Sequence, residues 1–582
     1  MKTLSIEKMN VPANMLLTDW MRLNFKRAFP DADHGAVPLH VTHATRPEFG
    51  DYQCNAAMTL AKVLKMPPRA VAAQIIEKAV PQDWVAKMEV AGAGFINIFL
   101  SDEWLARRAE EIGRDPERGV PKSGHGRVVI IDYSSPNVAK PMHIGHIRST
   151  VIGNALDRIH RFLGYRVISD NHLGDWGTQF GIIIMGYRNF LNQNALQNSP
   201  VEELERVYVK SYEKTAQDKD WMEQCRRELV KLQAGDRENT ALWEQFVKFS
   251  MEEFDKIYRR LDVKFDFVRG ESFYHKKLPP LISALAEKNI IRESEGALVA
   301  FLDENKLPPA IVRKSDGAFN YLATDIATVL SRNEEFQPEK IIYVTDERQQ
   351  LHFKQLFAVC RRMGIKTGLE HVWFGLMRLP QGTFSTREGN VIKLEKLLDE
   401  AEARAFELVR EINPEMPAEE QKEVARAVGI GAVKYADLCQ NPQSVVTFNW
   451  DKAMALNGNS APYLQYTYAR IRSVENKYFA AFPQKDFHSF DILLKEPQER
   501  NLALILARFA EIVPLAAQLY KPNVLADYLY QLASEYNLFY QNVPFLKAAD
   551  GIRESRVRLG SIIAGVLKQG LQLLGIDTPE RI

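Results

Sequence analysis

The chain has 582 residues, which is too many for one hydrophobic core and predicts two to four domains. Hydrophobic residues at 46% and charged residues at 26% are ordinary for a soluble globular protein, and a net charge of +1 neither implies nor excludes a nucleic-acid partner. Four isolated cysteines, no run apolar enough to span a membrane and no secretory signal favour a cytoplasmic protein with neither a zinc site nor a membrane partner.

The first unit is expected to span residues 1–122 and to mix helices with sheet. The spacing of its apolar residues predicts helices over 15–29, 56–64 and 70–79, followed by one strand over 90–100. A stretch with Pro and Gly at about 115–126 then predicts a linker.

From residue 123 to 395, short apolar runs alternate with segments of helical spacing. Strands are predicted over 128–131, 166–169, 340–344 and 371–376, with helices over 147–162 and 351–363. The charge-rich stretch at about 190–270 is predicted to be a helical insertion without a strand. This alternation predicts an α/β fold with a mainly parallel, doubly wound, Rossmann-like sheet, which binds ligands at the carboxyl ends of its strands.

Residues 396–582 are predicted to form a helix bundle. Helical spacing covers 397–411, 418–438 and 461–479, and it recurs in several segments between 499 and 574. The expected architecture is therefore a doubly wound α/β domain, preceded by an α+β domain and followed by an all-α bundle.

A polar turn after the first of these parallel strands carries the most informative local pattern. It contains Lys140 and the motif His143-Ile144-Gly145-His146, which runs into a helix. Free backbone N–H groups and the positive end of the helix dipole meet at such a helix start, where they suit a phosphate. Two imidazoles one turn apart add donors, so we expect this turn to hold a nucleotide phosphate and to stabilise charge that develops on it. The alternative is a helix start with only a structural role.

A second polar, Gly-rich loop spans residues 171–181 and opens another apolar helix. We expect it to face the first turn across the switch point of the sheet. Trp176 in this loop either lines the nucleotide side or is a buried structural residue.

Several stretches, in the right order along nearly the whole chain, resemble the class I aminoacyl-tRNA synthetases and, among these, the arginyl-tRNA synthetases. They are residues 135–146, 174–181, 321–327, 346–352, 427–436 and 459–466. The resemblance implies a ligase that activates L-arginine with ATP and transfers it to the terminal ribose of tRNA-Arg, with tRNA needed before activation. ATP would bring Mg²⁺ with it, no metal would be bound by the protein itself, and we expect a monomer.

The resemblance also implies roles for individual residues. The backbone end of arginine would contact Ser135, Asn137 and Gln349, and the guanidinium would contact Tyr321 and Asp325. Lys140, His143 and His146 would be catalytic, with both histidines stabilising charge on the α-phosphate. The residues that would bind the nucleotide are Gly145, Trp176, Gly177, His352, Ser385 and Arg387.

Elementary chemistry agrees with the implied arginine pocket. A guanidinium cannot lose its proton, so a buried site for it must offer a carboxylate. Tyr321 and Asp325 are four residues apart in a predicted helical turn and therefore share a face, where a ring and a carboxylate can bracket the planar cation. Such a site can reject an analogue by about ten-thousandfold, which would make an editing domain unnecessary. Considered alone, Asp325 could equally be a helix cap or a surface acid.

The chain departs from the family at two places. Many class I synthetases carry a K-M-S-K-S loop whose lysines bind pyrophosphate, but here the corresponding region is Phe384-Ser385-Thr386-Arg387-Glu388-Gly389-Asn390. Lys140 would reach the same phosphates from the other side, and Ser385 and Arg387 can still donate to them. The chain also ends at Ile582, where the family commonly has methionine.

Two regions are expected to contact tRNA. The first unit resembles the family's additional N-terminal domain, in which Phe95 and Asn97 would contact a base at the corner of the tRNA; both could instead be strand residues that face a core. In the bundle, Tyr463 and Tyr466, with Tyr468 nearby, could stack on splayed anticodon bases, although tyrosines at this spacing are more often core residues.

Two other functions stay open at this level. A small nucleotidylyltransferase would use the same histidine motif, but it would not need the long helical C-terminal part. A catalytically inactive relative that only binds tRNA would not need the intact set of implied active-site residues.

Overall fold

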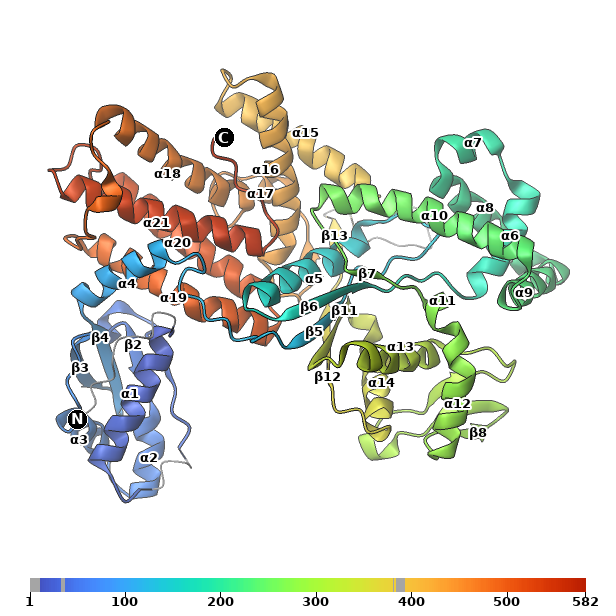
Figure 1. Cartoon of the computed structure of the whole chain (residues 1–582), viewed down its shortest axis with the longest axis horizontal. Helices are drawn as coiled ribbons and strands as arrows, with labels where there is room; N and C mark the ends of the chain where they lie inside the picture. Colours follow the sequence, from blue (N-terminus) through green and yellow to red (C-terminus); the bar gives the residue numbers. More distant parts are fainter. Residues whose placement is uncertain (1–10, 33–36, 380–381, 384–392) are drawn as a thin grey trace. The chain divides into compact units, whose positions relative to one another are not determined.

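The computed structural model describes residues 11–32, 37–379, 382–383 and 393–582, which form two compact units (Figure 1). One unit contains residues 1–123, 456–573 and 577–582, and the other contains residues 124–455 and 574–576. The second unit continues past the predicted boundary at residue 396. Long-range contacts hold residues 396–455 in this unit: the guanidinium of Arg148 lies 2.8 Å from the carboxylate of Asp437, both almost fully buried, and Met377 pairs with Val446 in a short sheet.

The second unit is built on a five-stranded parallel sheet with strand order β12-β11-β5-β6-β7. Its strands are β5 Val128–Asp132, β6 Arg166–Asn171, β7 Phe267–Val268, β11 Lys340–Asp346 and β12 Gly368–Phe374. The predicted Rossmann-like sheet is therefore confirmed. The prediction that residues 190–270 contain no strand was wrong, because β7 pairs with β6 there. Strand β7 has only two residues and is too short to show a periodic pattern in the sequence.

Helices cover both faces of this sheet, which is why its strands are continuously apolar. Helix α5 (Ile144–Phe162) lies on one face, and α13 (Tyr321–Phe336) and α14 (Gln350–Arg362) lie on the other (Figure 1). Ile130, Ile168 and Ile341 stand side by side on neighbouring strands and belong to the core beneath α13 and α14.

Helix α5 packs very closely against the side chain of Tyr133 at Gly153. A Cβ atom built on Gly153 would lie 2.2 Å from Cγ and 2.3 Å from Cβ of the fully buried Tyr133. Gly153→Ala should therefore lower the free energy of unfolding by about 1–3 kcal/mol, measured by chemical denaturation. The matched control is Gly560 in α21 (Ile552–Leu573), where the nearest atom is 3.6 Å away. Gly560→Ala should raise stability by about 0.4–1 kcal/mol, and equal losses at both positions would contradict this account.

The predicted insertion is helical over most of its length. Its helices, together with the helix that leads into it, are α6 Thr178–Phe190, α7 Gln193–Asn198, α8 Pro200–Gln217, α9 Lys219–Gln233 and α10 Arg237–Arg260. After β7 come α11 Glu271–Tyr274, η3 His275–Lys277 and α12 Leu278–Glu287. Two small sheets were not predicted; their strands are β8 Arg292–Ser294, β9 Ala297–Ala300, β10 Ala310–Arg313, β13 Met377–Leu379, β14 Gly382–Thr383 and β15 Val446–Thr447. Short turns are η4 Asp303–Asn305 and η5 Glu347–Gln349, and the unit ends with α15 Leu394–Ile412, α16 Ala418–Leu438 and α17 Trp450–Ala453.

The first unit contains a four-stranded antiparallel sheet with strand order β1-β2-β4-β3. Its elements are α1 Ala13–Ala28, β1 Val41–His43, η2 Pro47–Phe49, β2 Tyr52–Cys54, α2 Ala56–Leu64, α3 Pro68–Glu77, β3 Val85–Ala91, β4 Phe95–Leu100 and α4 Asp102–Arg114. The single strand predicted over 90–100 is in fact a hairpin. Gly92 and Gly94 have φ angles of 51° and 137°, which reverse the chain between β3 and β4.

The same unit contains the predicted helix bundle. It comprises α18 Ala461–Ala481, η6 Phe487–Ser489, α19 Pro497–Leu519, α20 Pro522–Asn542 and α21. Helix α19 is long and apolar enough to cross a membrane by length and composition, so the expectation that no such run exists was wrong. Two thirds of its most apolar window is buried inside the protein, which identifies α19 as a core helix of the bundle.

Candidate active site

The turn between β5 and α5 is strained and held by buried hydrogen bonds. Ser134, Ser135 and Ala139 have φ angles of 74°, 49° and 63°, in the left-handed region that costs non-glycine residues about 1–3 kcal/mol each. The Ser134 hydroxyl is 2.8 Å from the Tyr258 hydroxyl, and the Ala139 N–H donates to Oγ of Ser250 at 2.8 Å. Because Ser250 and Tyr258 belong to α10, the insertion fixes the shape of this turn.

The two histidines of the turn cap the start of α5 with one ring nitrogen each. Nδ1 of His143 accepts the Gly145 N–H at 3.0 Å, and Nδ1 of His146 accepts the His143 N–H at 3.1 Å. Each neutral ring must then carry its proton on Nε2. Burial, Lys140 and Arg348 lower the pKa of His143 to about 4, and burial with His143 lowers that of His146 to about 3. Both rings are therefore neutral at pH 7 and can each donate one N–H from Nε2.

Cations stand on the histidine side of the site. The Lys140 ammonium lies 4.8 Å from the ring centre of Tyr208 in α8, and it depresses the pKa of both histidines. Arg348, which we did not single out from the sequence, also acts on His143 and pairs with Asp346 at 2.7 Å. Its position within the stretch 346–352, which resembles the family, could have indicated that Arg348 belongs to the site. This side of the site suits anionic phosphates.

The second Gly-rich loop lies directly beside the first turn, as the switch-point argument predicted. The Val138 N–H donates to the Gly174 carbonyl and the Gly174 N–H donates to the Pro136 carbonyl, both at 3.2 Å. A Cβ on Gly174 would lie 2.2 Å from Oδ1 of Asn137, so a larger residue here would have to displace the Asn137 side chain.

Two neighbouring residues of that loop were expected to contact the nucleotide. Gly177 caps α6 with a φ of 128°, which favours glycine. Trp176 packs edge-on against Trp243 at 5.7 Å and near His275 at 5.2 Å. Gly145 is exposed at the start of α5.

Acidic and aromatic side chains gather on the other side of the site. Tyr321 and Asp325 lie on the first turns of α13, as expected, and Tyr321 is 62% exposed. Nε2 of His352, expected on the nucleotide side, lies 2.5 Å from Oδ2 of Asp325. Burial works to lower the pKa of His352, but the hydrogen bond and charge of Asp325 outweigh it and the pKa is raised.

Glu271 is a further carboxylate of this group that sequence reasoning missed. It begins α11, directly after β7, and is half-buried. Burial, followed by the charges of Asp325 and Asp175, raises the pKa of Glu271 to about 8. Burial, followed by the charges of Glu271 and Asp325, raises the pKa of Tyr321, and helix α11, which begins with Glu271, packs against α13. The signal that could have found Glu271 was its position after a strand, but that strand was not predicted.

The residues expected to hold the backbone end of arginine follow two adjacent strands, β5 and β11. Oγ of Ser135 donates to Oδ1 of Asp132 at 3.1 Å, and Asn137 is exposed beside the second loop. Gln349 is exposed in η5, just after β11. Ser385 and Arg387 lie outside the described residues. In the described part of the chain, no three His, Cys, Asp or Glu side chains are grouped so as to hold a metal ion.

The residues expected to contact tRNA lie in the first unit. Phe95 is half-buried, whereas Asn97 is 2% exposed and accepts a hydrogen bond from Gln53 at 2.7 Å. Tyr463 and Tyr466 are half-buried, with the guanidinium of Arg470 over the ring of Tyr466 at 4.9 Å. The nearby Tyr468 is a core residue that donates to Oε1 of Glu580 at 2.6 Å.

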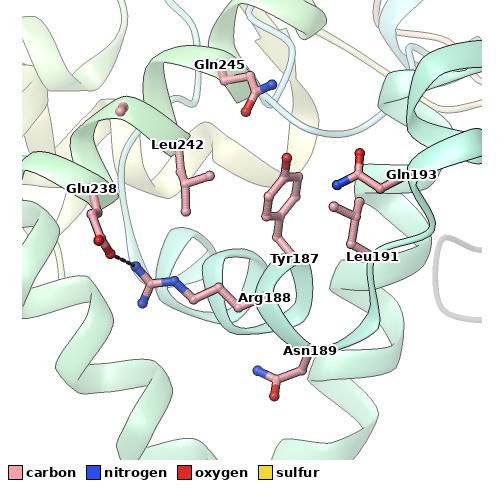
Figure 2. Close-up of a pocket in the computed structure, with 9 residues that line it drawn as sticks. Tyr187, Arg188, Asn189, Leu191, Gln193, Glu238, Leu242 and Gln245 are labelled. Atoms are coloured by element: carbon pink, nitrogen blue, oxygen red, sulfur yellow. Dashed lines mark hydrogen bonds and ion pairs between the residues drawn. The ribbon is translucent and has the colours of Figure 1, made fainter.

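A pocket of about 640 Å³ lies within the insertion, lined by α6, the loop after it and α10 (Figure 2). Arg188 and Glu238 form an ion pair at its edge, and Tyr187 and Gln245 point toward its interior. None of the residues that line it is among those predicted for the site. The pocket therefore lies apart from the histidine motif and the carboxylates.

Three family models match the chain. They are described as "tRNA synthetases class I (R), catalytic domain" over residues 112–450, "DALR anticodon binding domain" over 464–582, and "Arginyl tRNA synthetase N terminal domain" over 21–100. Together they cover both compact units.

Similar proteins of known name and structure point the same way. Arginine–tRNA ligases of Fusobacterium nucleatum and Laribacter hongkongensis are 46% and 43% identical; the alignments cover 96% and 94% of this chain, and 98% and 96% of those proteins. The solved arginyl-tRNA synthetase of Plasmodium falciparum superposes with a TM-score of 0.83 at 27% identity, covering 98% of this chain and 99% of that one. The Thermus thermophilus arginyl-tRNA synthetase gives a TM-score of 0.82 at 25% identity, covering 98% and 100%.

Proposed function

We propose how the residues of this chain catalyse its reaction from the premise that it belongs to the arginyl-tRNA synthetase family. The enzyme activates arginine with ATP and joins it to tRNA. In the first step a carboxylate oxygen of arginine attacks the α-phosphate of ATP, so that arginyl-adenylate forms and pyrophosphate leaves. In the second step a hydroxyl of the terminal ribose of tRNA-Arg attacks the activated carbonyl, and AMP leaves.

The observation that carries this proposal is the separation of charge across the site. Besides burial, the carboxylates of Glu271 and Asp325 act on the pKa of Tyr321, whereas the cations Lys140 and Arg348 act on that of His143. A guanidinium suits the first group and phosphates suit the second. An arginine that spans the site would place its carboxylate between them, next to the α-phosphate.

On the arginine side, Asp325 would pair with the guanidinium and Tyr321 would stack on it. His352 would hold Asp325 in position through their 2.5 Å contact. Ser135, Asn137 and Gln349 would contact the amino and carboxylate groups at the ends of β5 and β11. The planar guanidinium of arginine can pair with both carboxylates at once. The single ammonium of lysine cannot, so the site would disfavour lysine.

On the phosphate side, His143 and His146 would donate their Nε2 protons to the α-phosphate. Donors that are already oriented stabilise negative charge as it develops, without reorganisation. Lys140 would neutralise the pyrophosphate end of ATP. Gly145, Gly177 and Trp176 would border the nucleotide, which binds as its Mg²⁺ complex, and Ser385 and Arg387 would add donors.

The tRNA would contact the first unit through Phe95 and Asn97 and through Tyr463 and Tyr466. We expect the enzyme to work as a monomer in the cytoplasm, and we place residues 1–122 and 396–582 in tRNA binding. Contact between the Asn97 side chain and a base would require its hydrogen bond with Gln53 to open.

The test of this function is ATP–pyrophosphate exchange with arginine, measured with and without tRNA. Exchange only when tRNA is present supports the proposal. Exchange with another small acid would favour a nucleotidylyltransferase, and no exchange under either condition would favour an inactive relative.

The pH dependence of arginine binding tests the role of Glu271. A guanidinium favours the carboxylate form, so binding below the raised pKa of about 8 must release the Glu271 proton. The KM for arginine in exchange should therefore fall by up to about tenfold per unit as pH rises toward 8, and then level off. Glu271→Gln should remove this slope and leave the KM for ATP unchanged. A wild-type KM for arginine that is flat between pH 6 and 8 would contradict the role.

A further inference from the structure

Arg332 is a fully buried cation beneath the site, and the mechanism above does not use it. It lies on α13 and has 0% exposure. Its Nη2 atom donates to Oδ2 of Asp132 at 2.6 Å and to Oδ2 of Asp170 at 2.9 Å. These two aspartates lie at or next to the carboxyl ends of β5 and β6 and are paired in register. One guanidinium therefore ties α13 to the carboxyl ends of two central strands.

The position of Arg332 on α13 relates it to the arginine pocket. Residues 321, 325 and 332 are spaced by four and seven, so they lie on one face of the helix. The start of this face carries the proposed guanidinium contacts, and its last third is fixed to the sheet by Arg332. Any slide or rotation of α13 would move Tyr321 and Asp325 together, and it would have to break the buried contacts of Arg332.

The opposite end of the amino-acid site is attached to the same carboxylate. Oδ1 of Asp132 accepts the Ser135 hydroxyl at 3.1 Å, while Oδ2 accepts from Arg332. The Ser135 N–H also donates to Oδ1 of Asn171 at 3.0 Å. Asp132 thus joins the turn proposed to hold the backbone end of the substrate to the helix proposed to hold its guanidinium.

We propose that Arg332 is a positioning residue that, through Asp132 and Asp170, sets the distance between the two ends of the arginine site. This inference rests on the proposed function and extends it to substrate length. Arg332 does not touch the substrate. It determines where α13 stands relative to the β5 turn, and hence which side-chain length fits between Asp325 and Ser135.

A purely structural role for Arg332 predicts a different outcome. Loss of a buried ion pair that only stabilises the fold lowers stability and the fraction of active enzyme, but it does not alter the two substrates separately. A positioning role changes the KM for arginine and the choice between arginine and a longer analogue, while the KM for ATP stays the same.

The experiment is arginine-dependent ATP–pyrophosphate exchange, in the presence of tRNA, by Arg332→Lys. Lysine keeps the charge but cannot reproduce the planar geometry of the guanidinium. We expect the KM for arginine to rise about tenfold to a hundredfold, because a shift of about 1 Å at a site has effects of that size. The KM for ATP should stay within about twofold. The preference for arginine over homoarginine, which has one more methylene, should shrink from about 10–200-fold toward unity.

Two further variants make this test decisive. Arg188→Lys is the matched control, since Arg188 pairs with the buried Glu228 at 2.7 Å within the helical insertion; it should leave both KM values unchanged. Asp170→Asn removes one partner of Arg332 and should shift the KM for arginine in the same direction by a smaller factor, even if Arg332→Lys does not fold.

Unchanged preference for arginine over homoarginine in both Arg332→Lys and Asp170→Asn would overturn the inference, as would equal changes in the KM for arginine and ATP. Wild-type exchange with arginine under the same conditions would show that the proposed function holds in that case, so the two failures can be told apart.

Discussion

Replacing His146 by asparagine is expected to slow adenylate formation by about 10²–10³-fold, the usual effect of removing one oriented donor to a developing charge. Asparagine can place Oδ1 where Nδ1 of the ring accepts the His143 N–H, so the start of α5 keeps its cap. What the variant loses is the Nε2 proton aimed at the α-phosphate. The measurement is kcat for ATP–pyrophosphate exchange with saturating arginine and tRNA. His143→Asn should behave alike, since its Nδ1 caps Gly145 in the same way.

His160→Asn is the control for this experiment. His160 is buried farther along α5, where Nδ1 contacts the Leu156 carbonyl at 2.7 Å, away from the helix start. The His160→Asn variant should show the wild-type exchange rate per folded molecule. If His146→Asn retained wild-type kcat with an unchanged unfolding transition, the histidines would serve only as helix caps, and the donor role would be wrong.

Replacing Asp325 by asparagine should lower kcat/KM for arginine by about ten-thousandfold and leave the KM for ATP nearly unchanged. The guanidinium stays charged at every accessible pH, so a neutral residue at 325 removes one of the two carboxylates proposed to compensate its charge. The change also removes the charged partner of His352. Steady-state exchange with arginine and ATP varied independently measures both effects.

Asp316→Asn is the matched carboxylate control, because Asp316 lies in the exposed turn before α13 and accepts the Ala318 N–H at 3.0 Å. It should leave both constants unaltered. Equal losses for arginine and ATP in Asp325→Asn would show that Asp325 supports the fold of the site and does not read the substrate.

The sequence predicted the elements whose patterns are long enough to carry a period. The α/β sheet, its central strands and the long helices of both units follow from short apolar runs and from helical spacing. The hairpin of β3 and β4 was predicted as one strand because alternation continues across Gly92 and Gly94. The extension of the second unit beyond residue 396 rests on long-range contacts, such as Arg148 with Asp437 and Met377 with Val446, which no local pattern encodes.

The candidate site divides in the same way. Motif residues on the turn and on α13 could be named from the sequence, and the structure brings them to one edge of the sheet. Glu271 could not, because it follows a two-residue strand 54 positions before Asp325. The contact of His352 with Asp325, on the arginine side of the site, depends on the tertiary packing of α14 against α13. Similarly, the burial of Asn97 follows from its pairing with Gln53 across β2 and β4.

The most direct test of the account is the formation of aminoacyl-tRNA by the wild-type enzyme with unfractionated tRNA, ATP and each of the twenty amino acids in turn. We expect arginine alone to be attached, to tRNA-Arg, and lysine not to be attached even at high concentration. Attachment of a different amino acid, or formation of arginyl-adenylate without any transfer to tRNA, would contradict it.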